Sequence, residues 1–244
     1  MDLKNLFDSW AQTVGPDYSH KQWLLSKWEM FEGIDWPGEK REILIRTILH
    51  SLPLQSSDRL LDLGCGGGWI LDVLQPRVRR ACGLDVSWEM LRCAQTLLRQ
   101  IPLLCGEAGR LPFRSESFDK VLCYYVFVNF IDEEYIERSI AEIVRILRPR
   151  GRALIGQLPQ AGMSEQYDAA KTDYIEYHRR RMELGKETRG LFRPPLKFYR
   201  KELLVRCLDG QNIRFHFCDS FNPFYYSGQP ERVDWRFDIV LEKK

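Results

Sequence analysis

A glycine-rich turn that follows an apolar run constrains this sequence more than any other feature. The run Leu60–Leu63 leads into residues 64–69, which read Gly-Cys-Gly-Gly-Gly-Trp. Glycine has no Cβ, so the chain can turn sharply there and the backbone can approach a bound molecule closely. A helix that begins directly after the turn adds N–H groups and positive partial charge. We therefore expect a strand, a ligand-binding turn and a helix.

The spacing of these glycines excludes two common nucleotide-binding patterns. The phosphate-binding G-x-x-x-x-G-K-[ST] pattern fails because no Lys-Ser or Lys-Thr pair follows Gly68. The dinucleotide pattern G-x-G-x-x-G needs glycine at position 69 or 71, where the chain has Trp69 and Leu71. The interpretation as a nicotinamide-dependent oxidoreductase is therefore disfavoured. Binding of a nicotinamide cofactor would support it.

Short apolar runs alternate with helical patterns between residues 59 and 158, which is typical of βαβ units and a mainly parallel sheet. The helices are expected near 68–75, 88–99 and 133–147, the last with Asp132 as its N-cap. The strands are expected at 59–63, 81–85, 102–105, 120–125 and 152–157.

The remaining residues are expected to complete one domain of 244 residues. Residues 1–57 are predicted to form an N-terminal helical cap, and 58–158 the ligand-binding core. A charged stretch at 160–198 is predicted to be a lid-like insertion. Residues 199–244 are predicted to supply a helix at 201–208 and two antiparallel strands, 213–218 and 235–241, at one edge of the sheet.

The net charge and the cysteine content limit which binding partners and which cellular compartment are expected. The 36 Lys and Arg against 34 Asp and Glu leave a net charge of +2, too small for a global attraction to nucleic acid or to an anionic membrane. The seven cysteines form no C-x-x-C pair and do not cluster with the four histidines, so neither a metal site nor disulfides are expected. No signal peptide or long apolar run is visible, which predicts a cytoplasmic protein that does not enter membranes.

Four further motifs follow the glycine turn in a fixed order. The turn itself reads D-x-G-x-G-x-G from Asp62, and Asp85 ends the second strand. Residues 105–113 contain G-D-A-x-x-L-P-F, with Glu107 in place of the aspartate, and residues 117–121 match S-F-D-x-V. Residues 147–152 contain L-[KR]-P-G-G, with Arg150 in place of the first glycine. This order resembles the class I S-adenosylmethionine-dependent methyltransferases, in particular the small-molecule group with "type 11"-like domains.

The resemblance covers residues 58–158 and implies an α/β fold. That fold is Rossmann-like and doubly wound, with a mostly parallel seven-stranded sheet that has an antiparallel edge strand, an N-terminal helical cap and a helical insertion after the fifth strand. It also implies S-adenosyl-L-methionine as cofactor and S-adenosyl-L-homocysteine as product. The expected cofactor-binding residues are Asp62, Gly64, Cys65, Gly66, Gly68, Asp85, Val86, Met90, Glu107, Ala108, Cys123 and Tyr124.

The resemblance implies a role for three of these residues, and chemistry explains the choice of a carboxylate for the first. A carboxylate such as Asp85 holds a ribose diol by accepting both hydroxyls. Asp62 would orient the turn or meet the ammonium group of the cofactor. By the same resemblance, Glu107 addresses the adenine.

The acceptor side is less specified by the sequence. No catalytic residue is assigned, and the candidates for a general base are His20, Tyr124 and His178. Between Lys171 and Lys201 ten Lys or Arg stand against four acids, which indicates either a solvated helix face or a site for a carboxylate or phosphate. The candidate substrate residues are Tyr18, Arg179, Arg189 and Arg193.

The expected function is methyl transfer from S-adenosylmethionine to oxygen or nitrogen of a small molecule that carries a carboxylate or phosphate. Two alternatives stay open. One is a nucleic-acid or protein methyltransferase, although no nucleic-acid partner is expected at this net charge. The other is a non-catalytic protein that binds S-adenosylmethionine. The sequence leaves the oligomeric state open.

Overall fold

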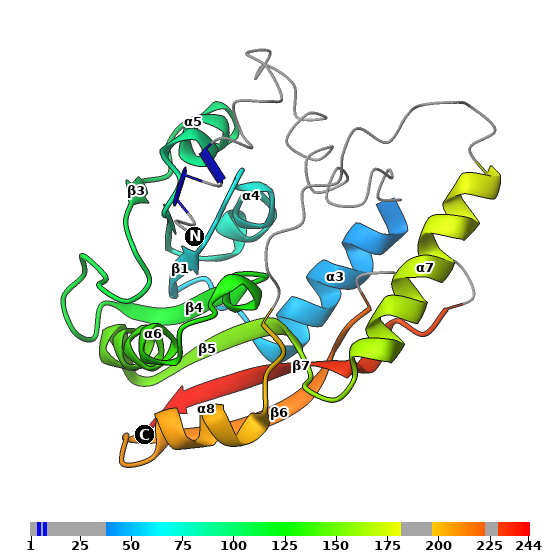
Figure 1. Ribbon diagram of the computed structural model, residues 1–244. Coiled ribbons are helices and arrows are strands. Elements are labelled where there is room, and N and C mark those ends of the chain that lie inside the picture. Colours follow the sequence, from blue (N-terminus) through cyan, green and yellow to red (C-terminus); the bar gives the residue numbers. More distant parts are fainter. Residues whose placement is uncertain (1–3, 6, 9–37, 182–196, 223–228) are drawn as a thin grey trace.

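A computed structural model describes residues 4–5, 7–8, 38–181, 197–222 and 229–244, with side chains from 40 to 173 in the long central part. Within these residues a seven-stranded sheet has the order β3-β2-β1-β4-β5-β7-β6 (Figure 1). Its strands are β1 (Arg59–Leu63), β2 (Arg80–Asp85), β3 (Leu103–Cys105), β4 (Phe118–Tyr124), β5 (Leu147–Pro159), β6 (Ile213–Phe221) and β7 (Arg232–Lys243).

Strands β1 to β5 are mutually parallel, as their alternating apolar and helical sequence predicts. Leu61 of β1 pairs with Cys82 on one side and Val121 on the other. β7 runs antiparallel to β5, with Leu154 opposite Val240, and β6 runs antiparallel to β7 at the edge. The predicted doubly wound, mostly parallel sheet with an antiparallel edge is confirmed, and the reversed strand is β7.

The strand order places a topological switch point at the carboxyl end of β1. From β1 the chain winds through β2 and β3 toward one edge, then returns to lay β4 and β5 on the other side of β1. Loops that leave β1 and β4 therefore diverge to opposite sides. In open α/β sheets ligands bind at such a switch point, outside the carboxyl ends of the strands.

Helices cover both faces of the sheet (Figure 1). One buried cluster joins the sheet to α6 (Glu133–Ile146) and α8 (Lys201–Leu208). The cluster on the opposite face joins it to α3 (Gly38–Ser51), α4 (Trp69–Leu74) and α5 (Trp88–Leu97). Two short 3-10 helices, η1 (Gln75–Arg77) and η2 (Phe127–Asn129), follow α4 and β4.

The best-defined helix, α6, begins where the sequence predicts. The side chain of Asp132 accepts a hydrogen bond from the Glu134 N–H at 3.1 Å, which satisfies one of the free donors of the first turn. Its buried face carries Ile136, Ile140 and Ile143. The helix ends at Ile146, because Leu147 already belongs to β5.

Part of the predicted insertion is the helix α7 (Ser164–Arg181), which packs on the start of β7. Tyr167 of α7, with Val233 and Trp235 of β7, forms a small separate cluster. Residues 182–196 of the insertion, and most of the predicted N-terminal cap, lie outside the described residues. The described part of the predicted cap contains the helix α3, whose Ile48 is fully buried. No helix among the described residues is long and apolar enough to cross a membrane.

Candidate functional site

The glycine turn lies at the carboxyl end of β1 and is pinned to β2. The N–H groups of Gly64 and Cys65 both donate to the Leu84 carbonyl, at 2.7 and 3.1 Å. Gly64, Gly66 and Gly68 have φ values of 77°, 52° and 82°, in the left-handed region that glycine adopts most easily. A Cβ on Gly64 would overlap the side chain of Val126, which follows β4. The turn therefore requires glycine both for its conformation and for its packing.

Asp85 closes the site from the end of β2. Its two carboxylate oxygens accept hydrogen bonds from the Gly66 N–H at 2.8 Å and from the Ser87 N–H at 2.9 Å. Burial raises the pKa of Asp85, and these backbone hydrogen bonds oppose the shift. A carboxylate has about four lone-pair positions, so Asp85 can accept two further hydrogen bonds, as a diol would supply.

Asp62 is the second carboxyl of the site, one residue before the end of β1. It is buried, and among the described residues no donor forms a hydrogen bond to its carboxyl group. Burial and the nearby charge of Asp85 raise the pKa of Asp62 to about 7. A buried carboxyl group without donors, next to a second carboxylate, makes this position favourable for a bound cation.

The remaining predicted cofactor residues of the first three strands gather around this pair. The Gly106 N–H donates to the Asp85 carbonyl at 2.9 Å, which brings the loop of Glu107 and Ala108 beside β2. Ala108 is buried and Glu107 is exposed. Met90 is buried, with its terminal methyl group next to Gly66. Val86, directly after Asp85, is half-buried.

Cys123 and Tyr124, at the end of β4, face opposite sides of the sheet. Cys123 packs in the cluster with α6, where burial raises its thiol pKa well above the ordinary value. The Tyr124 hydroxyl is 3.5 Å from the Asp238 carboxylate and 3.4 Å from the Gln157 amide nitrogen. Burial also raises the pKa of Tyr124 well above its ordinary range, which disfavours the phenolate that a general base would need.

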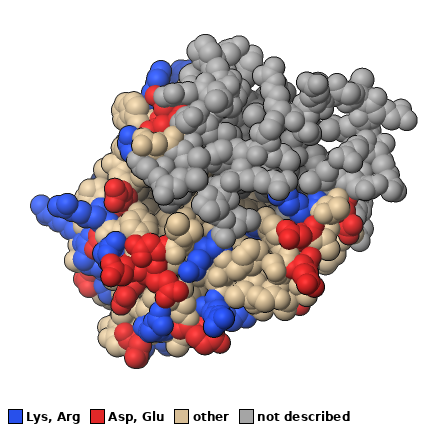
Figure 2. All heavy atoms as spheres, in the orientation of Figure 1, with Lys and Arg blue, Asp and Glu red and all other residues tan. Residues whose placement is uncertain are grey.

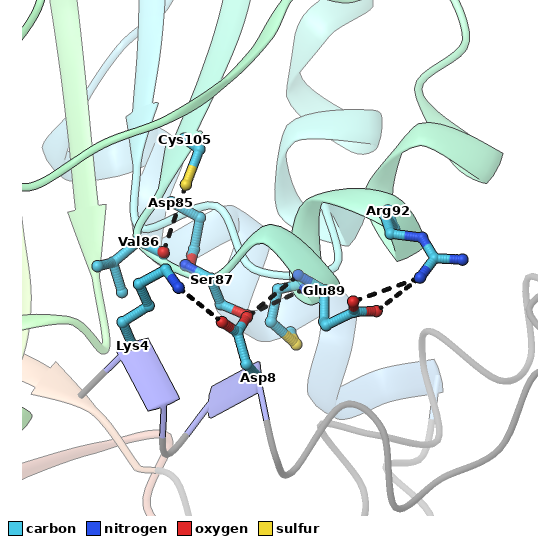
Figure 3. A network of polar contacts seen from close by, with 9 residues as sticks. Lys4, Asp8, Asp85, Val86, Ser87, Glu89, Arg92 and Cys105 are labelled. Atoms are coloured by element: carbon cyan, nitrogen blue, oxygen red, sulfur yellow. Dashed lines mark hydrogen bonds and ion pairs between the residues drawn. The ribbon is translucent and has the colours of Figure 1, made fainter. Parts of the chain in front are cut away.

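Residues near the N-terminus reach the same edge of the sheet, which sequence reasoning missed. Asp8 accepts hydrogen bonds from the Ser87 hydroxyl at 2.6 Å and from the Glu89 N–H at 3.2 Å, and forms an ion pair with Lys4 at 3.3 Å (Figure 3). Ser87 in turn caps α5 by accepting from the Met90 N–H. Asp8 therefore adds a negative charge at the start of α5, where the helix dipole favours it.

A buried polar network at the carboxyl end of β5 was also missed. Gln157 donates its backbone N–H to Asp238 at 2.8 Å and accepts two hydrogen bonds from Arg236. Ser220 donates its hydroxyl to the same Asp238 oxygen, at 2.5 Å. Burial raises the pKa of Asp238 to about 6. The only sequence signal was the alternation of charged residues in an apolar closing strand, which predicts solvent-facing positions.

The predicted acceptor residues are less well placed. Tyr18, His20, Arg189 and Arg193 lie outside the described residues. The backbone positions of His178 and Arg179 fall within α7, and their side chains are not described. After β4, Asn129 is buried and its side-chain oxygen has no hydrogen-bond partner in the described structure. No group of potential metal ligands occurs among the described residues.

Residues 61–155, which span β1 to most of β5, match the family model described as a methyltransferase domain. This part of the chain is a methyltransferase domain. The resemblance drawn from the five sequence motifs is thereby confirmed. Over 128 residues, 52% of this chain and 52% of the relative, the sequence is 32% identical to the demethylmenaquinone methyltransferase of Thermotoga maritima. The chain spans about half the length of the curated relatives it matches.

Solved structures support the fold of the methyltransferase domain and of the strands that follow it. A chain from the complex of the Haloferax volcanii Trm112 methyltransferase activator has a TM-score of 0.64 at 17% identity, with 97% of both chains covered. The N-methyltransferase NodS of Bradyrhizobium japonicum, crystallised with S-adenosylhomocysteine, has a TM-score of 0.58 at 13% identity, with 98% of both chains covered. At these identities the likeness concerns the fold.

Proposed function

We propose that this protein transfers a methyl group from S-adenosylmethionine to oxygen or nitrogen of a small molecule that carries a carboxylate or phosphate. The observation that carries the proposal is the pair of carboxyl groups around the glycine turn. Asp85 keeps lone pairs free for a ribose diol, and Asp62 is a buried acid with no donor among the described residues. S-adenosylmethionine offers the matching groups, namely a diol and an ammonium.

The chain's own residues would bind and orient the two reactants. Asp85 and the turn at Gly66 hold the nucleoside, Met90 and Ala108 pack beside it, and Asp62 becomes fully ionised when a cation binds. S-adenosylmethionine, when bound, supplies an activated methyl group on a sulfonium whose leaving group departs neutral. The protein's contribution is therefore alignment and exclusion of water rather than activation of the donor.

The acceptor class has separate support. The surface in Figure 2 mixes Lys and Arg with Asp and Glu over the described part of that face, and no broad basic area appears there. A duplex-binding surface would need such an area.

Calorimetric titration tests the cofactor assignment directly. We expect S-adenosylmethionine and S-adenosylhomocysteine to bind the wild type with micromolar dissociation constants and NAD not to bind. Asp85→Ala should weaken both by at least tenfold, because the diol loses its acceptor. The matched control is Asp209→Ala, an exposed acid after α8 at the opposite edge of the sheet. Equal affinity in Asp85→Ala, or binding of NAD instead, would overturn the proposal.

A further inference from the structure

Arg236 of β7 is a buried arginine with an unused donor edge. Its side chain is 3% exposed, and its Nη1 donates to the backbone oxygen and to Oε1 of Gln157, at 2.9 and 3.1 Å. Its Nε is buried and has no hydrogen-bond partner among the described residues, and Nη2 donates to none of them. Nε–H and Nη2 lie on one side of the planar guanidinium, where a two-oxygen anion binds with two parallel hydrogen bonds.

The charge of Arg236 is also not matched by an ion pair within the described part of the chain. Asp238, two residues along the strand, is bonded to Gln157 and Ser220 instead. Arginine is rarely buried without a partner, because removing its charge from water is costly. The rings of Tyr167, Tyr125 and Trp235 lie 5.0, 5.8 and 5.9 Å from the guanidinium carbon. They offer cation–π attraction but no conventional acceptor for Nε–H.

Gln157 holds the guanidinium in this orientation. Its backbone N–H is bonded to Asp238, and its side-chain nitrogen donates to the Ser220 hydroxyl at 2.8 Å and to the Phe221 carbonyl at 2.7 Å. Both of its oxygens accept from Arg236. Every polar atom of Gln157 is therefore engaged, so its side chain cannot turn to serve Nε of Arg236. Gln157 acts as a positioning residue.

Arg236 lies at the carboxyl end of β5, and two residues after β4 link it to the glycine turn. Arg236 pairs with Pro159 at the end of β5. Its guanidinium contacts the ring of Tyr125, the residue directly after β4, and the next residue, Val126, packs on Gly64. Two neighbouring residues thus connect the turn that would hold the methyl donor with the unpaired arginine.

We propose that Arg236 binds the anionic group of the methyl acceptor, a carboxylate or a phosphate, through its Nε–Nη2 edge. The inference rests on the proposed function, since it takes the carboxyl edge next to β4 as the acceptor's position. To the proposed function it adds one residue, Arg236, as the group that selects acceptors with an anionic group. An acceptor of this kind presents an anionic group to Arg236 while its nucleophilic atom lies toward the glycine turn.

The Nε–Hε resonance of Arg236 in the full-length protein, labelled with nitrogen-15 arginine, gives a direct readout. It is assigned by its loss in Arg236→Lys, and by sequential assignment of the wild type if that variant does not fold. The probes are benzoate, phenyl phosphate and the uncharged isostere benzamide, each titrated with and without S-adenosylhomocysteine. The control variant is Arg214→Lys, on the exposed edge strand β6.

We expect saturable downfield shifts of the Arg236 resonance with benzoate or phenyl phosphate, and at least tenfold weaker binding of benzamide. Arg236→Lys should weaken anion binding at least tenfold, because an ammonium lacks the planar fork. The tighter of the two anions identifies the group as carboxylate or phosphate. No saturable shift with either anion, or equal binding of benzamide, overturns the role of Arg236. Failure of S-adenosylhomocysteine to bind is measured separately by calorimetry and counts against the proposed function instead.

Discussion

Gly64 and Val126 pack so closely that a Cβ at position 64 would overlap the valine side chain. Gly64 also has a φ of 77°. Gly64→Ala should therefore cost the left-handed penalty of about 1 to 2 kcal/mol and an overpacking penalty of about 1 to 3 kcal/mol. Urea denaturation measures the sum. In Gly64→Ala with Val126→Ala the overlap is relieved while the φ penalty stays, so the added cost of the glycine change should fall. Full stability of the single variant would contradict this packing.

Asp62 should make the stability of the protein fall as pH rises. Its pKa is about 7 in the folded state, against an ordinary value of 3.8 for an aspartate in an unfolded chain. Between these two pH values the folded protein keeps a proton on Asp62 that the unfolded chain has lost. The stabilisation that this proton provides is lost as pH rises through 7. From pH 5 to pH 8 the loss should be about 2 to 3 kcal/mol.

Asp62→Asn is the matched variant, since its amide does not titrate in this range. We expect the difference in unfolding free energy between wild type and variant to change by that amount from pH 5 to pH 8, as measured by urea denaturation at both values. A difference that stays constant with pH would show that Asp62 titrates normally.

Asp8 should stabilise the first turn of α5. Asp8→Ala removes the acceptor for the Ser87 hydroxyl and the Glu89 N–H, at a cost of about 1 kcal/mol, as for other helix-capping groups. Hydrogen exchange of the Glu89 amide should become faster. Asp8→Asn keeps one oxygen acceptor, so its Glu89 exchange rate should lie between those of the wild type and Asp8→Ala. Unchanged exchange in Asp8→Ala would mean that this hydrogen bond does not protect the amide.

Arg150 occupies a left-handed conformation, with φ 64°, where the motif of the family has glycine. Arg150→Gly should relieve the backbone strain, but it also gives the unfolded chain more conformational entropy. The net effect should be a gain of about 0.5 to 1 kcal/mol in the free energy of unfolding. Thermal denaturation gives the measurement. Arg148→Gly is the contrasting control, because Arg148 has no positive φ and forms an ion pair with Asp119 at 2.9 Å. Arg148→Gly should lower stability. A gain in stability in both variants would contradict backbone strain at Arg150 as the cause.

The parts of the site that the sequence predicts are those that local chemistry determines. The glycine turn, the strand before it and Asp85 at the end of β2 follow from apolar runs and from backbone conformations that few residues adopt. The cap at Asp132 follows from the residue type at a helix start. The structure places all of them within a residue or two of the predicted positions.

The parts that the sequence did not predict depend on contacts between distant segments. Asp8 meets Ser87 across 79 positions, and Gln157 meets Asp238 across 81. Charged residues that alternate with apolar ones along a strand predict a solvent-facing side, yet Arg236 and Asp238 are both buried. Their burial arises because that side of β7 faces other residues of the fold, which the strand's own pattern does not contain.

The antiparallel strand β7 also determines the order in which the molecule can be assembled. Strands β1 to β5 pair with neighbours supplied by residues 59–159, whereas Leu154 must wait for Val240, 86 positions later. Contacts between such distant segments form slowly, because a long loop must close first. During translation the glycine turn can therefore be complete while Arg236 has not yet left the ribosome. The half of the site that would hold the methyl donor therefore forms before the half that would select the acceptor.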